Sequence, residues 1–164
     1  MKDIYRLIAE RLQNEVEDIK WIDLDNGQID FFEYRSSVDF PAVLINIKYS
    51  NCENVGTDGT QECDVEIELR CVFNLFDETN IHAPEEVRER ALEIFDIMNK
   101  IHGCLQNWHN DGTCGVITRR AVSRENRTDG SKVYNMTYRT TYFDSLAVRS
   151  EQEDVDANLF INSL

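Results

Sequence analysis

The chain has 164 residues, of which 41% are hydrophobic, so it is long and apolar enough for one domain with a real core. Its 31 acidic residues outnumber its 17 basic residues, and the resulting formal charge of −14 opposes adhesion to nucleic acid or to anionic membranes. No stretch approaches the length of a membrane span, and the N-terminus has no apolar segment of the kind that a signal peptide needs. We therefore expect a soluble, intracellular protein.

The first part of the chain has the pattern of a helix followed by strands. Apolar residues recur at three- and four-residue steps over residues 3–19, which predicts an amphipathic helix with one face to bury. After a turn, a short strand is expected around residues 29–34. Pro41 stands just before the apolar run 42–47, which is typical of a central strand because the missing N–H of proline lies outside the ladder.

The clearest periodic signal lies in residues 63–75. Every second residue is apolar, from Cys63 through Ile67 to Leu75, and the positions between them are mostly charged or polar. A pleated strand puts alternate side chains on opposite faces, so this pattern predicts a long strand with one buried face. Residues 84–105 carry apolar side chains at helical spacing, which predicts the helix that covers this face.

Residues 116–143 are predicted to form a β-hairpin, with strands over residues 116–123 and 133–143. Its second strand carries Tyr134, Tyr138 and Tyr142 on one face, where core or interface packing is favoured over stacking on nucleic acid bases.

The order of these elements predicts the fold class and the domain organisation. We expect an α+β fold, a mostly antiparallel β-sheet of about five strands with two helices packed on one face, in the order helix, three strands, helix, β-hairpin. Residues 1–148 are assigned to a single domain and residues 149–164 to an acidic C-terminal tail. The tail closes on the apolar run Leu159, Phe160 and Ile161, and is either frayed or docked on a neighbour.

The cysteines stand at positions 52, 63, 71, 104 and 114 without a closely spaced pair. An odd number of cysteines cannot all pair within one chain. Reduced thiols in a cytoplasmic protein are therefore the expected state.

Two groups of residues could carry chemistry. Asp64, Glu66 and Glu68 line one face of the long strand, and paired acids on a strand can hold Mg²⁺ in nucleases, but a solvated or interface face is favoured here. The second group could in principle bind zinc, and it consists of His102, Cys104, His109 and Cys114. The spacings of these residues match no standard zinc pattern, so structural or loop roles are favoured. The chain also has no Gly-x-Ser-x-Gly elbow and no phosphate loop. We therefore expect no enzyme activity, no metal site and no cofactor.

Several stretches together resemble the tail-terminator, or tail-completion, proteins of long-tailed bacteriophages and related prophage elements. The matching stretches are the N-terminal helix, residues 40–44 at the start of a strand, the strand over 66–73, the helix over 91–105 and the strand over 133–144. The resemblance implies an α+β fold assembled into a ring, commonly a hexamer, that caps the tail tube and faces the head–tail connector. It implies a virion protein, assembled in the bacterial host cytoplasm, through which DNA passes without specific binding.

The charge of the chain is unevenly spread, and this predicts a subunit interface. Basic residues outnumber acidic ones between Cys114 and Arg149, whereas the rest of the chain is more acidic. A ring built from one kind of subunit uses a heterologous contact, in which two different surfaces meet. The expected interface consists of Asp64, Glu66, Glu68, Arg119, Arg120 and Arg124.

Two other function classes stay open from the sequence. A small acidic inhibitor or immunity-type binding protein would use surface carboxylates to mask a basic toxin. A metal-dependent nuclease is the third interpretation. A monomer that binds a basic partner tightly would favour the inhibitor, and metal-dependent turnover would favour the nuclease.

Overall fold

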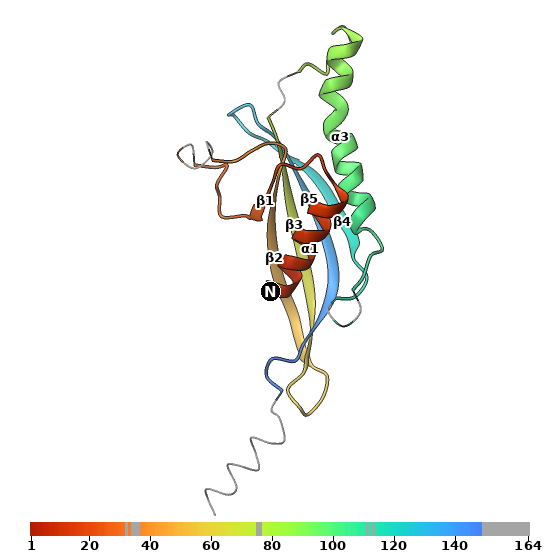
Figure 1. The fold of residues 1–164 in the computed structure, drawn as a ribbon. Helices are drawn as coiled ribbons and strands as arrows, with labels where there is room; N and C mark the ends of the chain where they lie inside the picture. Colours follow the sequence, from red (N-terminus) through yellow and green to blue (C-terminus); the bar gives the residue numbers. More distant parts are fainter. Residues whose placement is uncertain (32, 34–36, 75–76, 111, 113, 149–164) are drawn as a thin grey trace, which may run out of the picture.

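The computed structural model describes residues 1–31, 33, 37–74, 77–110, 112 and 114–148. In this part of the chain, helices α1 and α3 pack on one face of a five-stranded β-sheet (Figure 1). The elements are α1 (Lys2–Glu15), β1 (Trp21–Leu24), β2 (Ala42–Asn54), β3 (Gln61–Phe73), α3 (Glu85–Leu105), β4 (Thr118–Glu125) and β5 (Lys132–Asp144). The predicted α+β class and the order helix, three strands, helix, hairpin are confirmed.

The strand order in the sheet is β1-β2-β3-β5-β4. Strand β1 runs parallel to β2, and every other neighbouring pair is antiparallel. Strand β3 is the centre of the sheet because β2 pairs with it on one side and β5 pairs with its whole length on the other. The edges of the sheet are therefore β4 on one side and, on the other, β1 and the part of β2 that extends past β1.

The alternation of apolar and polar residues in β3 corresponds to one buried face and one open face, as predicted. From Cys63 onward its odd-numbered side chains, among them Val65, Ile67 and Leu69, are buried, while the even-numbered positions up to Arg70 are only half-buried. The buried side chains join one core cluster with Met136 and Tyr138 of the neighbouring strand β5. One face of the sheet is therefore apolar and lies under the helices, and the other is an open polar face.

The helices supply the other half of this core. Ile4, Ile8 and Leu12 of α1 are fully buried, as are Ala91 and Ile101 of α3. Burial of a side chain of this kind stabilises the fold by roughly 1.5–3 kcal/mol, so the helix contacts account for much of the core energy. The N-terminal part of α3 extends past the end of the sheet (Figure 1). Among the described residues, no helix combines the length and the apolar character that crossing a membrane would require.

The prediction for the first strand is wrong in position. The strand is β1 (Trp21–Leu24), and Ile29 lies instead in a loop, where it is buried in a small second cluster with Val38 and Leu44. The turn before Ile29 is fixed locally, because the N–H of Gly27 donates to Asp25 and the carbonyl of Gly27 accepts from the N–H of Asp30. Residues 32 and 34–36 lie outside the described residues.

The end of the first helix also differs from the predicted one, whereas the second helix ends where predicted. Helix α1 stops at Glu15 rather than at residue 19, because Val16 has an extended backbone with φ of −130°. Helix α3 runs through Gly103 and ends at Leu105.

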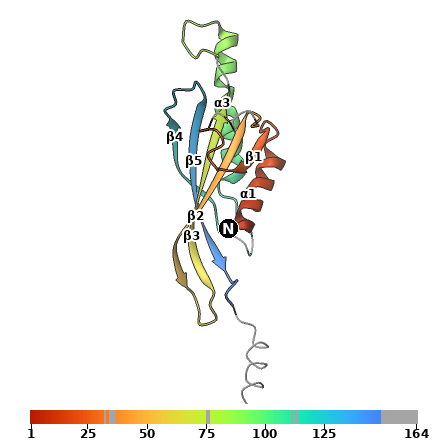
Figure 2. The same ribbon diagram turned by 90° about the vertical axis from the view of Figure 1, so that its left-hand side faces the viewer.

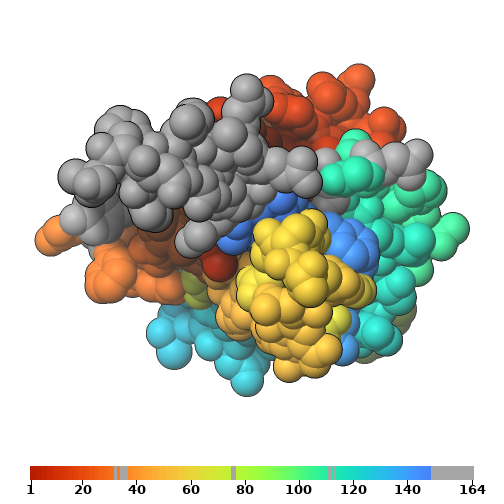
Figure 3. All heavy atoms as spheres, turned by 90° about the horizontal axis from the view of Figure 1, so that it is seen from below, coloured from red at the N-terminus to blue at the C-terminus, as the bar shows by residue number. Residues whose placement is uncertain are grey.

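The ends of β2 and β3 that lie away from α3, together with their connection, form a projecting hairpin that we call the arm, residues 50–62 (Figure 2). Seen from below, the arm protrudes beside the end of β5 (Figure 3). A break in the register between Ser50 and Glu53 brings Cys52 beside Cys63, with Cα atoms 4.1 Å apart, and the two cysteines form a disulfide. The expectation that all cysteines are reduced is therefore wrong for this pair.

The remaining cysteines are buried thiols. Burial raises the pKa of Cys71 to about 12 and that of Cys104 to about 11, and it also raises the pKa of Cys114. Protonated, buried thiols are poor nucleophiles, which agrees with a packing role.

The two faces of β3 should respond differently to substitution. Ile67→Ala removes a fully buried side chain and should lower the free energy of unfolding by about 2–5 kcal/mol. The control Glu66→Gln, on the open face, should change it by less than about 1 kcal/mol because only an exposed ion pair is lost. Urea unfolding followed by circular dichroism measures both values, and similar losses in the two variants would contradict the assigned faces.

The disulfide can be detected in a single peptide. Trypsin should release residues 49–70, which contain Cys52 and Cys63, between Lys48 and Arg70. In a non-reduced digest this peptide should be lighter by the mass of two hydrogens and should take no alkylating label, whereas Cys71, Cys104 and Cys114 should be labelled after unfolding. Labelling of Cys52 and Cys63 in the non-reduced protein would contradict the bond.

Candidate assembly surface

Strand β4 forms an exposed basic edge of the sheet. It pairs only with β5, and Arg119, Arg120 and Arg124, which we call the basic edge, are all exposed. Arg119 and Arg124 lie opposite Tyr138 and Tyr134 of β5, which puts them on the side of the sheet that carries the helices. Within the described part of the chain, none of the three guanidinium groups forms a salt bridge. The basic edge is therefore available to an acidic surface.

The same edge is protected against unspecific strand pairing. Arg120 lies in a register break between Arg119 and Ala121, and the N–H of Arg119 donates to the side chain of Gln106 at 2.9 Å. Bulges and charged side chains are the usual devices that keep an edge strand from pairing with other chains. A contact at this edge would therefore use side-chain charge more than strand addition.

The predicted acidic residues of β3 lie on the open face of the sheet, away from the side chains of Arg119 and Arg124. Each of these carboxylates has a partner in its own chain. Asp64 accepts a hydrogen bond from Asn51 at 3.0 Å and lies 3.6 Å from Arg139. Lys48 lies 2.7 Å from Glu68 and 3.8 Å from Glu66. The structure thus brings together the three acidic residues, and separately the three arginines, but it does not bring the two groups together within one subunit.

These partners follow from the register of the sheet. Glu66 lies between Lys48 of β2 and Arg139 of β5, so cations from both neighbouring strands share its face. The carboxylate set that could have held Mg²⁺ is consequently engaged by cations and amides. The negative character of the open face instead increases toward the arm, where Glu53 lies directly opposite Glu62. Like charges in opposite positions destabilise a strand pair, so a cation from outside would be favourable there.

At the other end of the open face, two arginines share a group of carboxylates. Arg70 donates to Asp30 at 2.8 Å and to Glu125 at 2.7 and 2.9 Å. Arg127 donates to the same two carboxylates at 2.6 and 2.8 Å and to Asp129 at 2.6 Å. This network ties the loop before β2 to β3 and to the β4–β5 hairpin. Arg127, one of the basic residues between Cys114 and Arg149, therefore forms its ion pairs inside the subunit.

The network changes the acidity of its members. Hydrogen bonds from Arg70, and then from Arg127, hold the pKa of Asp30 at about 2, below its ordinary 3.8. The same donors lower the pKa of Glu125. The hydrogen bonds that the arginines donate to these carboxylates raise the pKa of Arg70 and of Arg127, so both stay charged.

The histidines and cysteines considered for zinc do not gather. Cys104 and Cys114 are buried in the core cluster, and His102 lies on α3 with its ring centre 6.3 Å from that of Tyr138. Burial lowers the pKa of His102. No group of three or more metal-ligating side chains forms among the residues that the structure describes.

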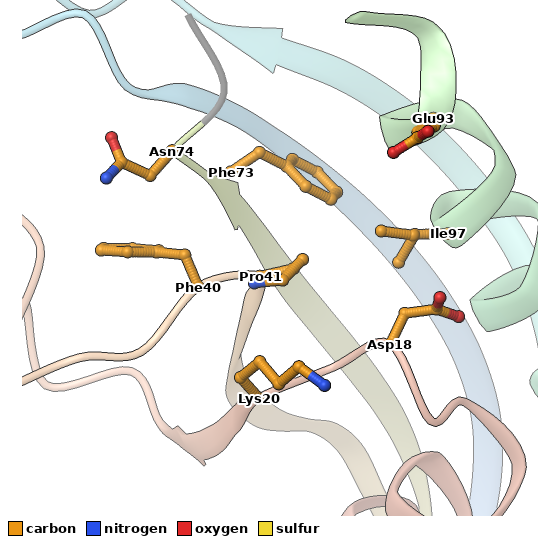
Figure 4. A pocket seen from close by; sticks show the side chains of 8 residues that line it. All are labelled: Asp18, Lys20, Phe40, Pro41, Phe73, Asn74, Glu93 and Ile97. Atoms are coloured by element: carbon orange, nitrogen blue, oxygen red, sulfur yellow. The ribbon is translucent and has the colours of Figure 1, made fainter. Parts of the chain in front are cut away.

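A small pocket lies between the start of β2, the end of β3 and α3 (Figure 4). Its volume is about 270 Å³, and Pro41, Phe73 and Ile97 form its apolar part, with the ring of Phe73 pointing toward Ile97. Asp18 at its rim accepts a hydrogen bond from Lys100 at 2.7 Å, which lowers the pKa of Asp18. The pocket could seat one apolar side chain.

A scan against models of known protein families found no match to this chain, and a search of curated proteins found none either.

The arginine network should make stability depend on pH. Because the pKa of Asp30 in the fold lies below its unfolded value of 3.8, its ionised form stabilises the fold fully above that value, and the stabilisation is lost as the pH falls toward about 2. Asp30→Asn should therefore lower the free energy of unfolding by about 1–2 kcal/mol near neutral pH, a value reduced by the partial exposure of the carboxylate.

The difference between wild type and Asp30→Asn should shrink toward zero between about pH 4 and pH 2. Urea unfolding over a pH series measures it, with the exposed Asp39→Asn as the matched control. A difference that is constant over this range would contradict the network.

Proposed function

We propose that this chain is a structural assembly protein of a phage or prophage tail, a tail terminator whose copies form a ring, with six copies as the expected number. The ring caps the tail tube and joins it to the head–tail connector. Its action is stoichiometric, because a ring laid on the growing tube covers the exposed end and blocks further addition. The support comes from the resemblance of five stretches of the sequence and from the surface described above.

The observation that carries the proposal is an unpaired basic edge on an acidic protein. The chain has 17 basic against 31 acidic residues, and cations such as Lys48, Arg70 and Arg127 are bound to carboxylates of their own subunit. The arginines of the basic edge are exposed and without such partners in the described part of the chain. A second copy offers the complementary acidic surface, and such pairing of unlike surfaces favours a heterologous contact.

The two charged surfaces overlap along the strands but lie on different parts of the subunit. Through β5, Arg119 stands level with Ile67 and Arg124 level with Cys71, whereas the acidic face runs from Glu68 to Asp64 toward the arm. The basic edge of one copy therefore meets the acidic face of another in a head-to-tail contact, which joins two different surfaces. Repeated around an axis, a contact of this kind closes into a ring.

The acidic surface that stays outside the subunit contact suits the wall of a channel through which DNA passes. DNA passing through the ring carries a dense negative charge, and walls of the same sign repel it. The excess of carboxylates over cations thus suits a passage that DNA crosses without binding.

An acidic inhibitor of a basic protein is the second candidate, and the paired Glu53 and Glu62 of the arm favour it over an enzyme. Such an inhibitor would stay monomeric without its partner. The oligomeric state therefore separates the two candidates.

The ring contact should depend on salt and on the basic edge. Size exclusion with light scattering should find an oligomer at low salt that dissociates at about 1 M salt, where the Debye length falls to about 3 Å. Arg119→Glu with Arg120→Glu should weaken association by roughly tenfold or more.

The matched control is Lys2→Glu with Arg6→Glu, which makes the same change of charge at exposed positions of α1. It should leave the oligomer intact. A wild-type chain that is monomeric at every concentration, or an oligomer indifferent to salt and to the β4 reversal, would contradict this function.

A further inference from the structure

A second groove lies at the end of the sheet opposite the arm. It has a volume of about 570 Å³ and runs between the first half of α3, residues 77–80 and the start of β5. Phe95 of α3 and Tyr134 of β5 form its apolar wall, and their rings meet edge to face with centres 5.7 Å apart. Phe95 is 41% exposed, so its ring is accessible to an apolar group that enters the groove.

Cations stand at the rim of this groove. Arg124 has no salt-bridge partner among the described residues, and the ammonium of Lys132 donates only to the main-chain carbonyl of Asp77, at 3.3 Å. The carboxylate of Asp77 is engaged by Arg90 at 3.3 and 3.4 Å, so Glu78 is the remaining carboxylate of the lining. An occupant should therefore combine acidic side chains with an apolar group.

The C-terminal segment of this chain, residues 149–164, has that composition. Its acidic run is followed at once by an apolar run, which consists of Leu159, Phe160 and Ile161; the acidic side chains are Glu151, Glu153, Asp154 and Asp156. An apolar anchor in a groove with a complementary charged rim is the usual form of a peptide contact.

The position of Val148 indicates which copy supplies the segment. The described chain ends beside the arm, while the groove lies at the start of β5, and strand β5 between them spans about 40 Å. A tail from Val148 to Phe160 covers at most about 40 Å when fully extended, so it would have to run straight back along its own subunit. In the proposed ring, the head-to-tail contact gives each tail one neighbouring copy whose groove is a second destination.

We propose that the C-terminal segment of each copy docks in the groove of the next copy, with Phe160 against Phe95 and Tyr134 and the acidic run beside Arg124 and Lys132. The inference rests on the proposed function, because that arrangement provides the neighbouring copy. It adds to the charge contact a link that fastens each subunit to the next.

The first test measures binding at the groove. The probe is a fluorescent synthetic peptide of residues 149–164, and the receptor is the full-length chain with Phe160→Ser, whose own tail competes weakly. Fluorescence anisotropy should show saturable binding that weakens by roughly tenfold or more with Phe95→Ser or with Arg124→Glu in the receptor. The peptide carrying Phe160→Ser should bind as weakly.

Arg124 is exposed, so Arg124→Glu keeps the test valid if Phe95→Ser fails to fold. No binding of the wild-type peptide, or equal binding to all receptors, would overturn the groove as the docking site.

The second test identifies the copy. Heavy-isotope and ordinary full-length chains, both with a photo-crosslinking residue in place of Phe160, are mixed under dissociating salt, returned to low salt and irradiated. Cross-links from position 160 to peptides around Phe95 or Tyr134 should join heavy to light chains. Cross-links confined to one isotope, or directed elsewhere, would overturn exchange between copies.

Light scattering on the same samples distinguishes failure of the tail docking from failure of the proposed assembly function. A salt-sensitive oligomer without groove cross-links would overturn the docking and leave the assembly function standing. Groove cross-links between copies in an oligomer that ignores the Arg119→Glu, Arg120→Glu reversal would support the docking and contradict the charge contact.

Discussion

The pairing of β3 with a strand on each side is the interaction on which the rest of the structure depends. Because successive residues of a strand point to opposite faces, one register decides which side chains the helices cover. A slip of one residue would expose Ile67 and bury Glu66. The same register sets Lys48 and Arg139 on either side of Glu66, and it carries β2 and β3 past β1 and β4 into the arm. The core, the charge pattern and the shape of the molecule thus follow from one set of strand pairings.

The distribution of charge follows from this arrangement. Most cations near the sheet face are bound within the subunit, by carboxylates that neighbouring strands or loops present to them. Strand β4 is different because it has a neighbour on one side only, so side chains at its outer edge meet solvent. On such an edge strand, arginines can stay without carboxylate partners from their own subunit and can pair with carboxylates of a second copy.

The sequence predicts the features that repeat locally. The alternation in β3 and the helical spacing in α3 identify both elements, because the burial of each residue is set by its own strand or helix. The first strand was misplaced because Ile29, an apolar residue after a turn, is buried by a loop instead of a strand. A short strand that pairs in parallel, as β1 does, leaves little periodic signal.

Contacts between residues that lie far apart in the chain could not be predicted from the sequence. The disulfide requires the register break beside Ser50, and the binding of Arg127 requires Asp30, which lies far away in the chain. The predicted interface through Arg119, Arg120 and Arg124 stays a prediction, and the three side chains are exposed. That Arg119 and Arg124 lie on the opposite face of the sheet from Glu66 could not be predicted without the register. The groove beside Phe95 was missed because that residue fits the helical stripe and looks like an ordinary core position.

Closure of the copies into a ring is tested most directly by electron microscopy of the purified full-length chain at low salt. Class averages should contain closed rings with an open centre, six copies being the expected number, and the rings should be lost in the Arg119→Glu, Arg120→Glu variant. Particles that are only single subunits would contradict assembly through unlike charged surfaces, and open filaments in place of rings would contradict closure.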